Sequence, residues 1–152
     1  MFIELTDHLR CTEDHAESFL VLLPAEMKAR HVIRGSLGCP ACGRVVEIES
    51  GVTDFGGEPP HSAASSLTAD AALALLGIDG PGGHLALIGG AAAMAAPLAE
   101  LLPAVSLAMV NPPATAVPPA GSVIRAARFP IKVASMRGVV IAADHAADPV
   151  WL

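Results

Sequence analysis

The second half of the chain contains four short apolar runs, and a segment with the hydrophobic period of a helix lies between the first two. Residues 85–88, 106–110, 122–125 and 139–142 are such runs, and a helical segment over 91–102 separates the first two. Uninterrupted apolar strands that alternate with helices are typical of a parallel sheet covered on both faces. We therefore predict four parallel strands. A crossover helix between the third and fourth is not evident, because residues 126–137 contain Pro130.

Local start and stop signals define further elements. Thr68 can cap a helix that runs to Leu76, and Gly77 follows its last residue. In the first part of the chain, residues 13–23 are predicted to be helical and to end at Pro24. Residues 30–36 and 44–49 are predicted to be short strands that flank a tight turn at residues 39–43.

Composition divides the chain into three regions. Residues 1–56 hold all three cysteines and most of the charge, residues 57–66 form a Pro- and Ser-rich linker, and residues 67–152 are rich in alanine. Hydrophobic residues make up 53% of the chain, which is ample for a core. The uncharged stretch over 80–99 is interrupted by Pro81, Pro97 and several glycines, so we predict no membrane span. The N-terminal residues lack an apolar signal core, and we expect a cytoplasmic protein.

Charge argues against a nucleic-acid partner. The formal net charge is −6 at pH 7, with only nine Lys and Arg residues. Affinity for nucleic acid comes largely from clustered positive charge. The one basic cluster is interpreted as a solvated face, and it comprises Arg125, Arg128, Lys132 and Arg137.

The cysteines point to a metal site. Cys39-Pro40-Ala41-Cys42-Gly43 is a knuckle in which two thiolates bind one ion from a tight turn, with Gly43 free to adopt a left-handed conformation. Cys11 and His15 stand four residues apart and would point the same way on one helical turn. Three thiolates and one imidazole form a structural zinc site, so Cys11, His15, Cys39 and Cys42 are the predicted ligands. A redox Cys-x-x-Cys pair and inert cysteines are the alternatives, and His8 and His31 compete with His15.

The segment around the knuckle resembles a known family. Residues 37–43 together with the strand and turn over 46–55 resemble the Trm112-like zinc domain. That family has a Cys-Pro-x-Cys-Gly knuckle followed by a strand, and it is often fused ahead of class I S-adenosylmethionine methyltransferases. The rest of the chain resembles the first half of such an enzyme.

The resemblance also exposes departures at the positions that hold the cofactor in the family. Leu87 stands in place of an acid, Ala91 and Ala93 replace two glycines, and Asn111 follows the second strand where the family has an acid. Further along, Ala126-Ala127 and Met136-Arg137 replace two more acidic motifs. Asp144 and His145 could form an acid–base pair or simply cap the fourth strand. We therefore expect a methyltransferase-like fold with no catalytic residues and no S-adenosylmethionine binding.

The combined expectation is an α/β protein with two parts. Residues 1–56 form a Trm112-like zinc-binding domain, residues 57–66 a linker, and residues 67–152 a truncated Rossmann-like half-domain with a four-stranded parallel sheet in the order 3-2-1-4. Its expected role is that of an accessory subunit that binds a protein partner, or a second copy, through the edge of the fourth strand. Apolar surface would also remain on the sheet faces. An atypical methyltransferase completed by a second chain, or a pocket for another small ligand near Gly89 and Gly90, are the alternatives.

Overall fold

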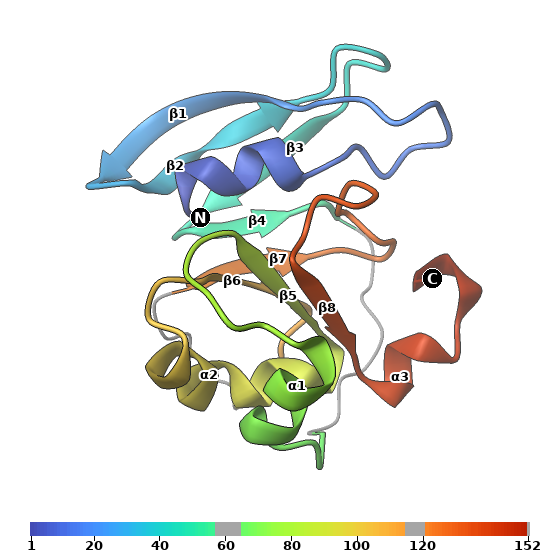
Figure 1. Cartoon of the computed structure of the whole chain (residues 1–152). Coiled ribbons are helices and arrows are strands. Elements are labelled where there is room, and N and C mark those ends of the chain that lie inside the picture. Colours follow the sequence, from blue (N-terminus) through green and yellow to red (C-terminus); the bar gives the residue numbers. More distant parts are fainter. Residues whose placement is uncertain (57–64, 115–120, 152) are drawn as a thin grey trace.

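The computed structural model of this chain describes residues 1–56, 65–114 and 121–151 (Figure 1). Its strands form one mixed sheet in the order β1-β2-β3-β4-β7-β6-β5-β8. Their bounds are β1 Val21–Lys28, β2 His31–Gly38, β3 Val45–Glu49, β4 Val52–Asp54, β5 His84–Ile88, β6 Ser106–Val110, β7 Gly121–Arg125 and β8 Gly138–Ile141. The predicted mixed α/β class is confirmed, and β2 and β3 flank the cysteine turn as expected.

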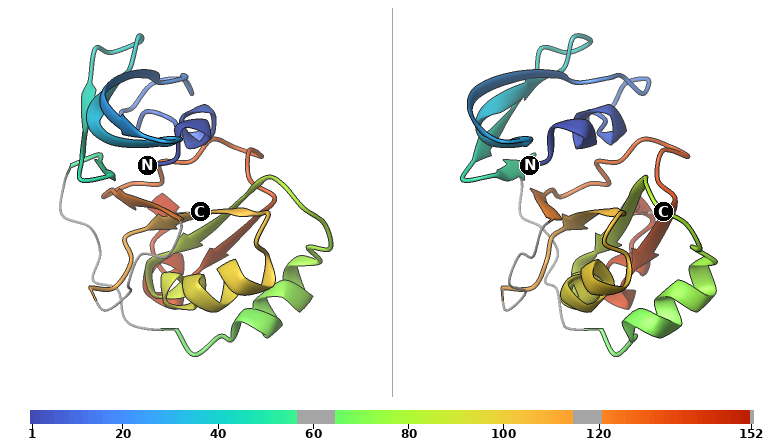
Figure 2. Two further views of the ribbon diagram at one scale, coloured as in Figure 1. Left: turned by 90° about the vertical axis from the view of Figure 1, so that its left-hand side faces the viewer. Right: turned by 60° about the vertical axis from the view of Figure 1, so that its left-hand side comes forward.

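The first four strands are antiparallel and strongly curved. The short 3-10 helix η1 (Ile3–His8) lies inside the curve of β1–β3 (Figure 2). The prediction of a helix over 13–23 is wrong. Residues 13–16 form a bend, and β1 begins at Val21 and contains Pro24. Leu20 is buried whereas Val21 and Leu23 are exposed, and this alternation suits a strand. Proline is tolerated because β1 is an edge strand, and its register with β2 shifts just after Pro24.

The last four strands are parallel. Their order, β7-β6-β5-β8, is the predicted 3-2-1-4, since β5 comes first along the chain. All five residues of β5 are buried, as expected for a strand covered on both faces. β4 pairs in parallel with β7 through Val52 and Val123, so the N-terminal strands continue the same sheet.

Two predicted helices form, and one differs from expectation. α1 (Ala69–Leu76) has the predicted caps: Thr68 Oγ1 accepts the Ala71 N–H at 3.3 Å, and Gly77 is left-handed with φ +61°. The segment predicted as one helix over 91–102 begins as a 3-10 helix, η2 (Gly89–Met94), and continues as α2 (Ala95–Leu101). No helix lies between β7 and β8. Short α3 (Ala143–Ala146) and η3 (Pro149–Trp151) follow β8.

Both faces of the parallel strands are covered. One buried cluster joins Leu85 and Leu87 to α1, η2 and α2, which lie on one side of the sheet (Figure 1). On the other face, Ile88 and Ile124 belong to a cluster that includes Leu5 of η1 and Trp151. The prediction that apolar surface remains on the sheet faces is therefore wrong, because N-terminal and C-terminal segments cover the second face.

Of the predicted linker over 57–66, residues 57–64 lie outside the described residues. Among the described residues, no helix has the length and apolar character needed to cross a bilayer.

Candidate metal centre

The knuckle is a closed turn between β2 and β3. The Cys39 N–H donates to the Arg44 carbonyl at 2.8 Å, and the Gly43 N–H donates to the Cys39 carbonyl at 2.8 Å. Gly43 has φ +75°, the left-handed conformation that glycine adopts without strain. Backbone hydrogen bonds therefore hold Cys39 and Cys42 on one side of the turn.

The segment that follows η1 brings the other two ligand candidates to this turn. The Arg10 N–H donates to the Pro130 carbonyl at 2.9 Å, and Glu13 forms an ion pair with Arg44 of the knuckle. Residues 13–16 form a bend rather than the helical turn that the spacing of Cys11 and His15 suggested. The two side chains converge nonetheless, because the chain turns back at His15, whose N–H donates to the Glu13 carbonyl at 3.0 Å.

The four predicted ligands lie together with distances that fit a tetrahedral ion. The ligand atoms of Cys11, His15, Cys39 and Cys42 are all within 4.8 Å of one another. Cys11 Sγ is 3.7 Å from Cys42 Sγ, and Cys39 Sγ is 3.5 Å from His15 Nε2. Around a zinc ion, the edges of a tetrahedron are about 3.8 Å between two sulfurs and about 3.6 Å between sulfur and nitrogen. The donor set and its spacing therefore fit zinc.

Hydrogen bonding prepares two of these residues for a cation. His15 Nδ1 donates to the Ala16 carbonyl at 2.7 Å, which leaves the Nε2 lone pair facing the sulfurs. This bond is the main reason that the pKa of His15 is raised. Burial alone would raise the pKa of Cys39, but the backbone N–H groups of Cys42 and Ala41 favour its thiolate and lower that pKa to about 7.

The Cys11 thiol is hard to ionise without a nearby cation. Burial, followed by the neighbouring Cys39 and Cys42, raises the pKa of Cys11 to about 12. Three thiolates so close together repel one another, and a bound cation reverses this balance by deprotonating the thiols.

The competing histidines are engaged elsewhere. His8 Nδ1 donates to the Ser135 carbonyl at 2.9 Å, and its ring packs at a tilt against His84 with centroids 4.3 Å apart. His31 packs edge-on against Phe2. No second group of three or more ligand-type side chains occurs among the described residues.

A second polar cluster occupies the carboxyl ends of β5, β6 and β8. Asn111 has φ +50°; its amide donates to the Ala126 carbonyl at 2.8 Å, and its oxygen accepts the Ala126 N–H at 3.0 Å. His145 is fully buried and lies 3.4 Å from Asn111 and 3.1 Å from Asp144. A Cβ on Gly89 would be only 2.4 Å from His145 Nδ1. In parallel α/β sheets, this end of the strands is where ligands bind, and here side chains fill it.

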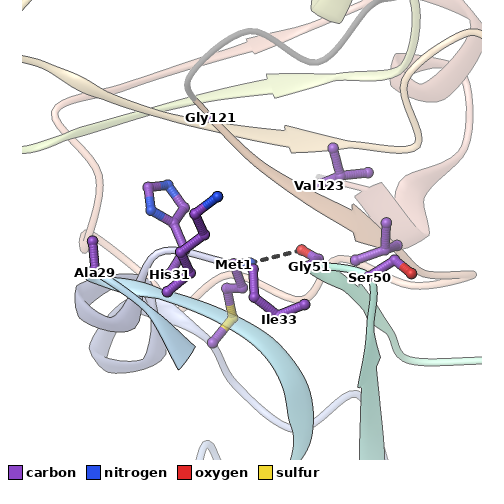
Figure 3. Close-up of a pocket in the computed structure, with 10 residues that line it drawn as sticks. Met1, Ala29, His31, Ile33, Ser50, Gly51, Gly121 and Val123 are labelled. Carbon is purple, nitrogen blue, oxygen red and sulfur yellow. Dashed lines mark hydrogen bonds between the residues drawn. The ribbon is translucent and has the colours of Figure 1, made fainter. Parts of the chain in front are cut away.

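Sequence reasoning missed two features formed by residues distant in the chain. His84 is buried, and neither ring nitrogen has a hydrogen-bond partner among the described residues. A cavity of about 450 Å³ lies between β2, β4 and β7, and Figure 3 shows His31, Ile33 and Val123 on its walls. The Met1 amino group at this cavity already donates to the carbonyls of Gly51, at 2.7 Å, and Val32, at 2.9 Å. No sequence motif marks either feature.

Comparison of the chain with protein-family models, curated proteins and solved structures found no match. The features of this chain that bear on its function are therefore the four clustered ligand-type side chains and the filled ends of the parallel strands.

Proposed function

We propose that this chain is a zinc-stabilised, non-catalytic protein of methyltransferase-like fold that acts as an accessory subunit. The observation that carries this proposal is the burial of His145 against Gly89 and Asn111, where a methyltransferase would hold its cofactor. The strand order β7-β6-β5-β8 and the resemblance of residues 37–55 to Trm112-like domains support it. We assign no group-transfer step to Gly89, Asn111 or His145.

Zinc would serve a structural role. Cys11, His15, Cys39 and Cys42 would together fill all four positions of a tetrahedral ion, which leaves none for a substrate or water. The site would join the segment after η1 to the β2–β3 turn, two parts of the chain that otherwise meet through the Glu13–Arg44 ion pair and neighbouring contacts. Zinc binding would then contribute directly to the free energy of folding.

Loss of cofactor binding is supported by what replaces the binding residues. The side-chain amide of Asn111 donates to the Ala126 carbonyl and accepts the Ala126 N–H. Ala91, in place of a glycine, is completely buried. An adenosine moiety at this position would have to displace His145, which also packs edge-on against Trp151 with ring centroids 4.7 Å apart.

Calorimetric titration with S-adenosylmethionine tests the non-catalytic part of the proposal. We expect no binding heat up to millimolar cofactor. A dissociation constant in the micromolar range would instead support the atypical methyltransferase, and Asp144 and His145 would then be the first residues to replace.

The edge of β8 is the proposed contact with a partner. β8 is the last strand of the sheet order, and its residues are uncharged and half-buried. An uncharged β-branched edge offers unpaired backbone groups to another strand. Sedimentation at low micromolar concentration, combined with hydrogen exchange at Val140 and Ile141, tests this assignment. A monomer with slow exchange at both amides would show that the edge is protected within the chain and would contradict it.

A further inference from the structure

The outer face of β1–β3 is the side of these strands opposite η1 in Figure 2, and it carries exposed apolar side chains. Phe19, Val21, Leu23 and Val45 define this outer patch and are 60%, 44%, 62% and 58% exposed. Their chain neighbours Leu20 and Val46 are buried beneath the sheet. The period of two within β1 and β3 therefore places Val21, Leu23 and Val45 on the solvent side, and Phe19 is exposed two residues before Val21. Apolar side chains gathered in this way typically mark a binding surface.

Strand register places a glycine between two of the valines of the outer patch. Val21 lies opposite Gly38, and Gly38 lies opposite Val45, so the three form one cross-strand row. A Cβ on Gly38 would meet no atom closer than the Val21 carbonyl oxygen at 4.0 Å. Internal packing therefore does not demand glycine here. Because Gly38 has no side chain, the row has a notch between the side chains of Val21 and Val45.

The same face becomes acidic along β3 and β4. The next cross-strand row runs from Leu23 through Ser36 to Glu47 and Asp54, and Glu49 follows two residues after Glu47 on the same face. All three carboxylates are exposed. Arg34, a basic residue two positions before Ser36 in β2, already pairs with Glu26 at 3.0 Å.

We propose that the outer patch docks a segment of another polypeptide in which apolar residues are flanked by lysine or arginine. Apolar side chains would cover Phe19 and Leu23 and enter the notch at Gly38, while the basic residues would face Glu47 and Asp54. Charge complementarity of this kind sets orientation and excludes wrong partners. A second copy of this chain fits poorly, because it would bring the same carboxylates against each other.

This surface is independent of the proposed contact at β8. β1 and β8 stand at opposite ends of the sheet order. The inference also holds whether or not the chain binds S-adenosylmethionine, so the two proposals can fail separately.

Fluorescence anisotropy with a labelled peptide of alternating leucine and lysine tests the inference on the full, zinc-loaded chain. Replacing lysine by glutamate, or leucine by serine, gives the two control peptides. We expect the leucine–lysine peptide to bind and both control peptides to bind at least about tenfold more weakly. Val45→Lys and Glu47→Lys should each weaken binding by about tenfold.

Leu75→Lys is the matched control, because Leu75 is exposed on α1, away from the outer patch, and the charge change is the same. It should leave peptide affinity unchanged. Circular dichroism and zinc content confirm that each variant is folded. Equal binding by Val45→Lys and Leu75→Lys, or equal binding of the leucine–glutamate peptide, would overturn the inference. So would a dimer of the unaltered chain that Val45→Lys dissociates, since the occupant would then be a second copy.

Discussion

His15 owes its position to hydrogen bonds within its own bend. The Ala16 carbonyl holds Nδ1, and Nε2 then points at the sulfur of Cys39. His31, in contrast, packs against Phe2 and joins no cluster of ligand-type side chains within the described part of the chain. The pair therefore offers a comparison between a proposed ligand and a histidine that does not contact the site.

We expect His15→Gln to weaken zinc binding strongly and His31→Gln to leave it unchanged. Loss of a hydrogen bond to a ligand alone typically costs about 10–100-fold in metal affinity, and loss of the ligand costs no less. Competition with a chromophoric zinc chelator measures both variants. Zinc affinity in His15→Gln equal to that of the unaltered chain would remove His15 from the site.

Buried His84 makes stability depend on pH. Its pKa is lowered, first by burial and then by the charge of nearby His8. Arg137 donates its N–H to the His84 carbonyl at 2.9 Å, while its guanidinium binds the carbonyls of Gly80 and Gly82. The folded protein therefore disfavours the protonated ring, whereas the unfolded chain accepts a proton near pH 6.5.

Because the unfolded chain binds more protons, the free energy of unfolding should fall as the pH drops below about 6.5 towards the lower pKa of the folded state. Above about pH 6.5, this contribution is fully present. His84→Leu should remove this part of the pH dependence because leucine cannot be protonated. It also removes two buried ring nitrogens that have no hydrogen-bond partner among the described residues. Urea unfolding of zinc-saturated protein at about pH 5 and about pH 7.5 measures the pH dependence. Identical pH dependence in the variant would contradict the prediction.

At the scale of elements, the turn from β5 into η2 depends on Gly89. This residue has φ +62°, and His145 of α3 occupies the space where a Cβ would project. Gly77, at the end of α1, has almost the same φ of +61° but nothing within 4 Å of a Cβ. Substitution of the two glycines in turn therefore distinguishes the cost of a left-handed backbone from the cost of a steric clash.

We expect Gly77→Ala to cost about 1 kcal/mol of stability through its left-handed backbone alone. Gly89→Ala should cost a further ~1–3 kcal/mol, because the methyl group must displace His145. Thermal or urea unfolding measures the difference. Equal losses in the two variants would mean that His145 can move aside, and would reopen this end of the sheet to a ligand.

At the scale of the whole molecule, one sheet and one buried cluster connect the N-terminal strands to the parallel strands. β4 pairs with β7, and the cluster that contains Leu5 and Val46 also contains Ile88 and Ile124. If the four clustered residues bind zinc as proposed, the binding should stabilise the entire fold rather than residues 1–56 alone.

Removal of zinc with a chelator should accelerate hydrogen exchange of Val46 in β3 and Ile124 in β7 together. Amides in one cooperative unit open with the same free energy. Exchange monitored by NMR with and without chelator measures both sites. Faster exchange at Val46 with no change at Ile124 would show that the zinc module unfolds by itself.

Local chemistry in the sequence determined several parts of this fold. The caps at Thr68 and Gly77 set the ends of α1, and the apolar runs over 85–88 and 106–110 became buried strands, because these signals act between near neighbours. The Cys39–Gly43 spacing likewise predicted the knuckle, since a tight turn needs only its own residues.

Long-range contacts decided the rest. Residues 21–28 became a strand because β2 pairs with them, a partner that local periodicity could not reveal. The spacing from Cys11 favoured His15 but left His8 and His31 as competitors, and the folded chain brings His15 to within 3.5 Å of the Cys39 sulfur. The pairing of β4 with β7, the covering of the sheet by η1 and Trp151, and the closure of the Gly89 end by His145 all join residues far apart in the chain. Such contacts depend on the packing of the whole molecule, which no single segment encodes.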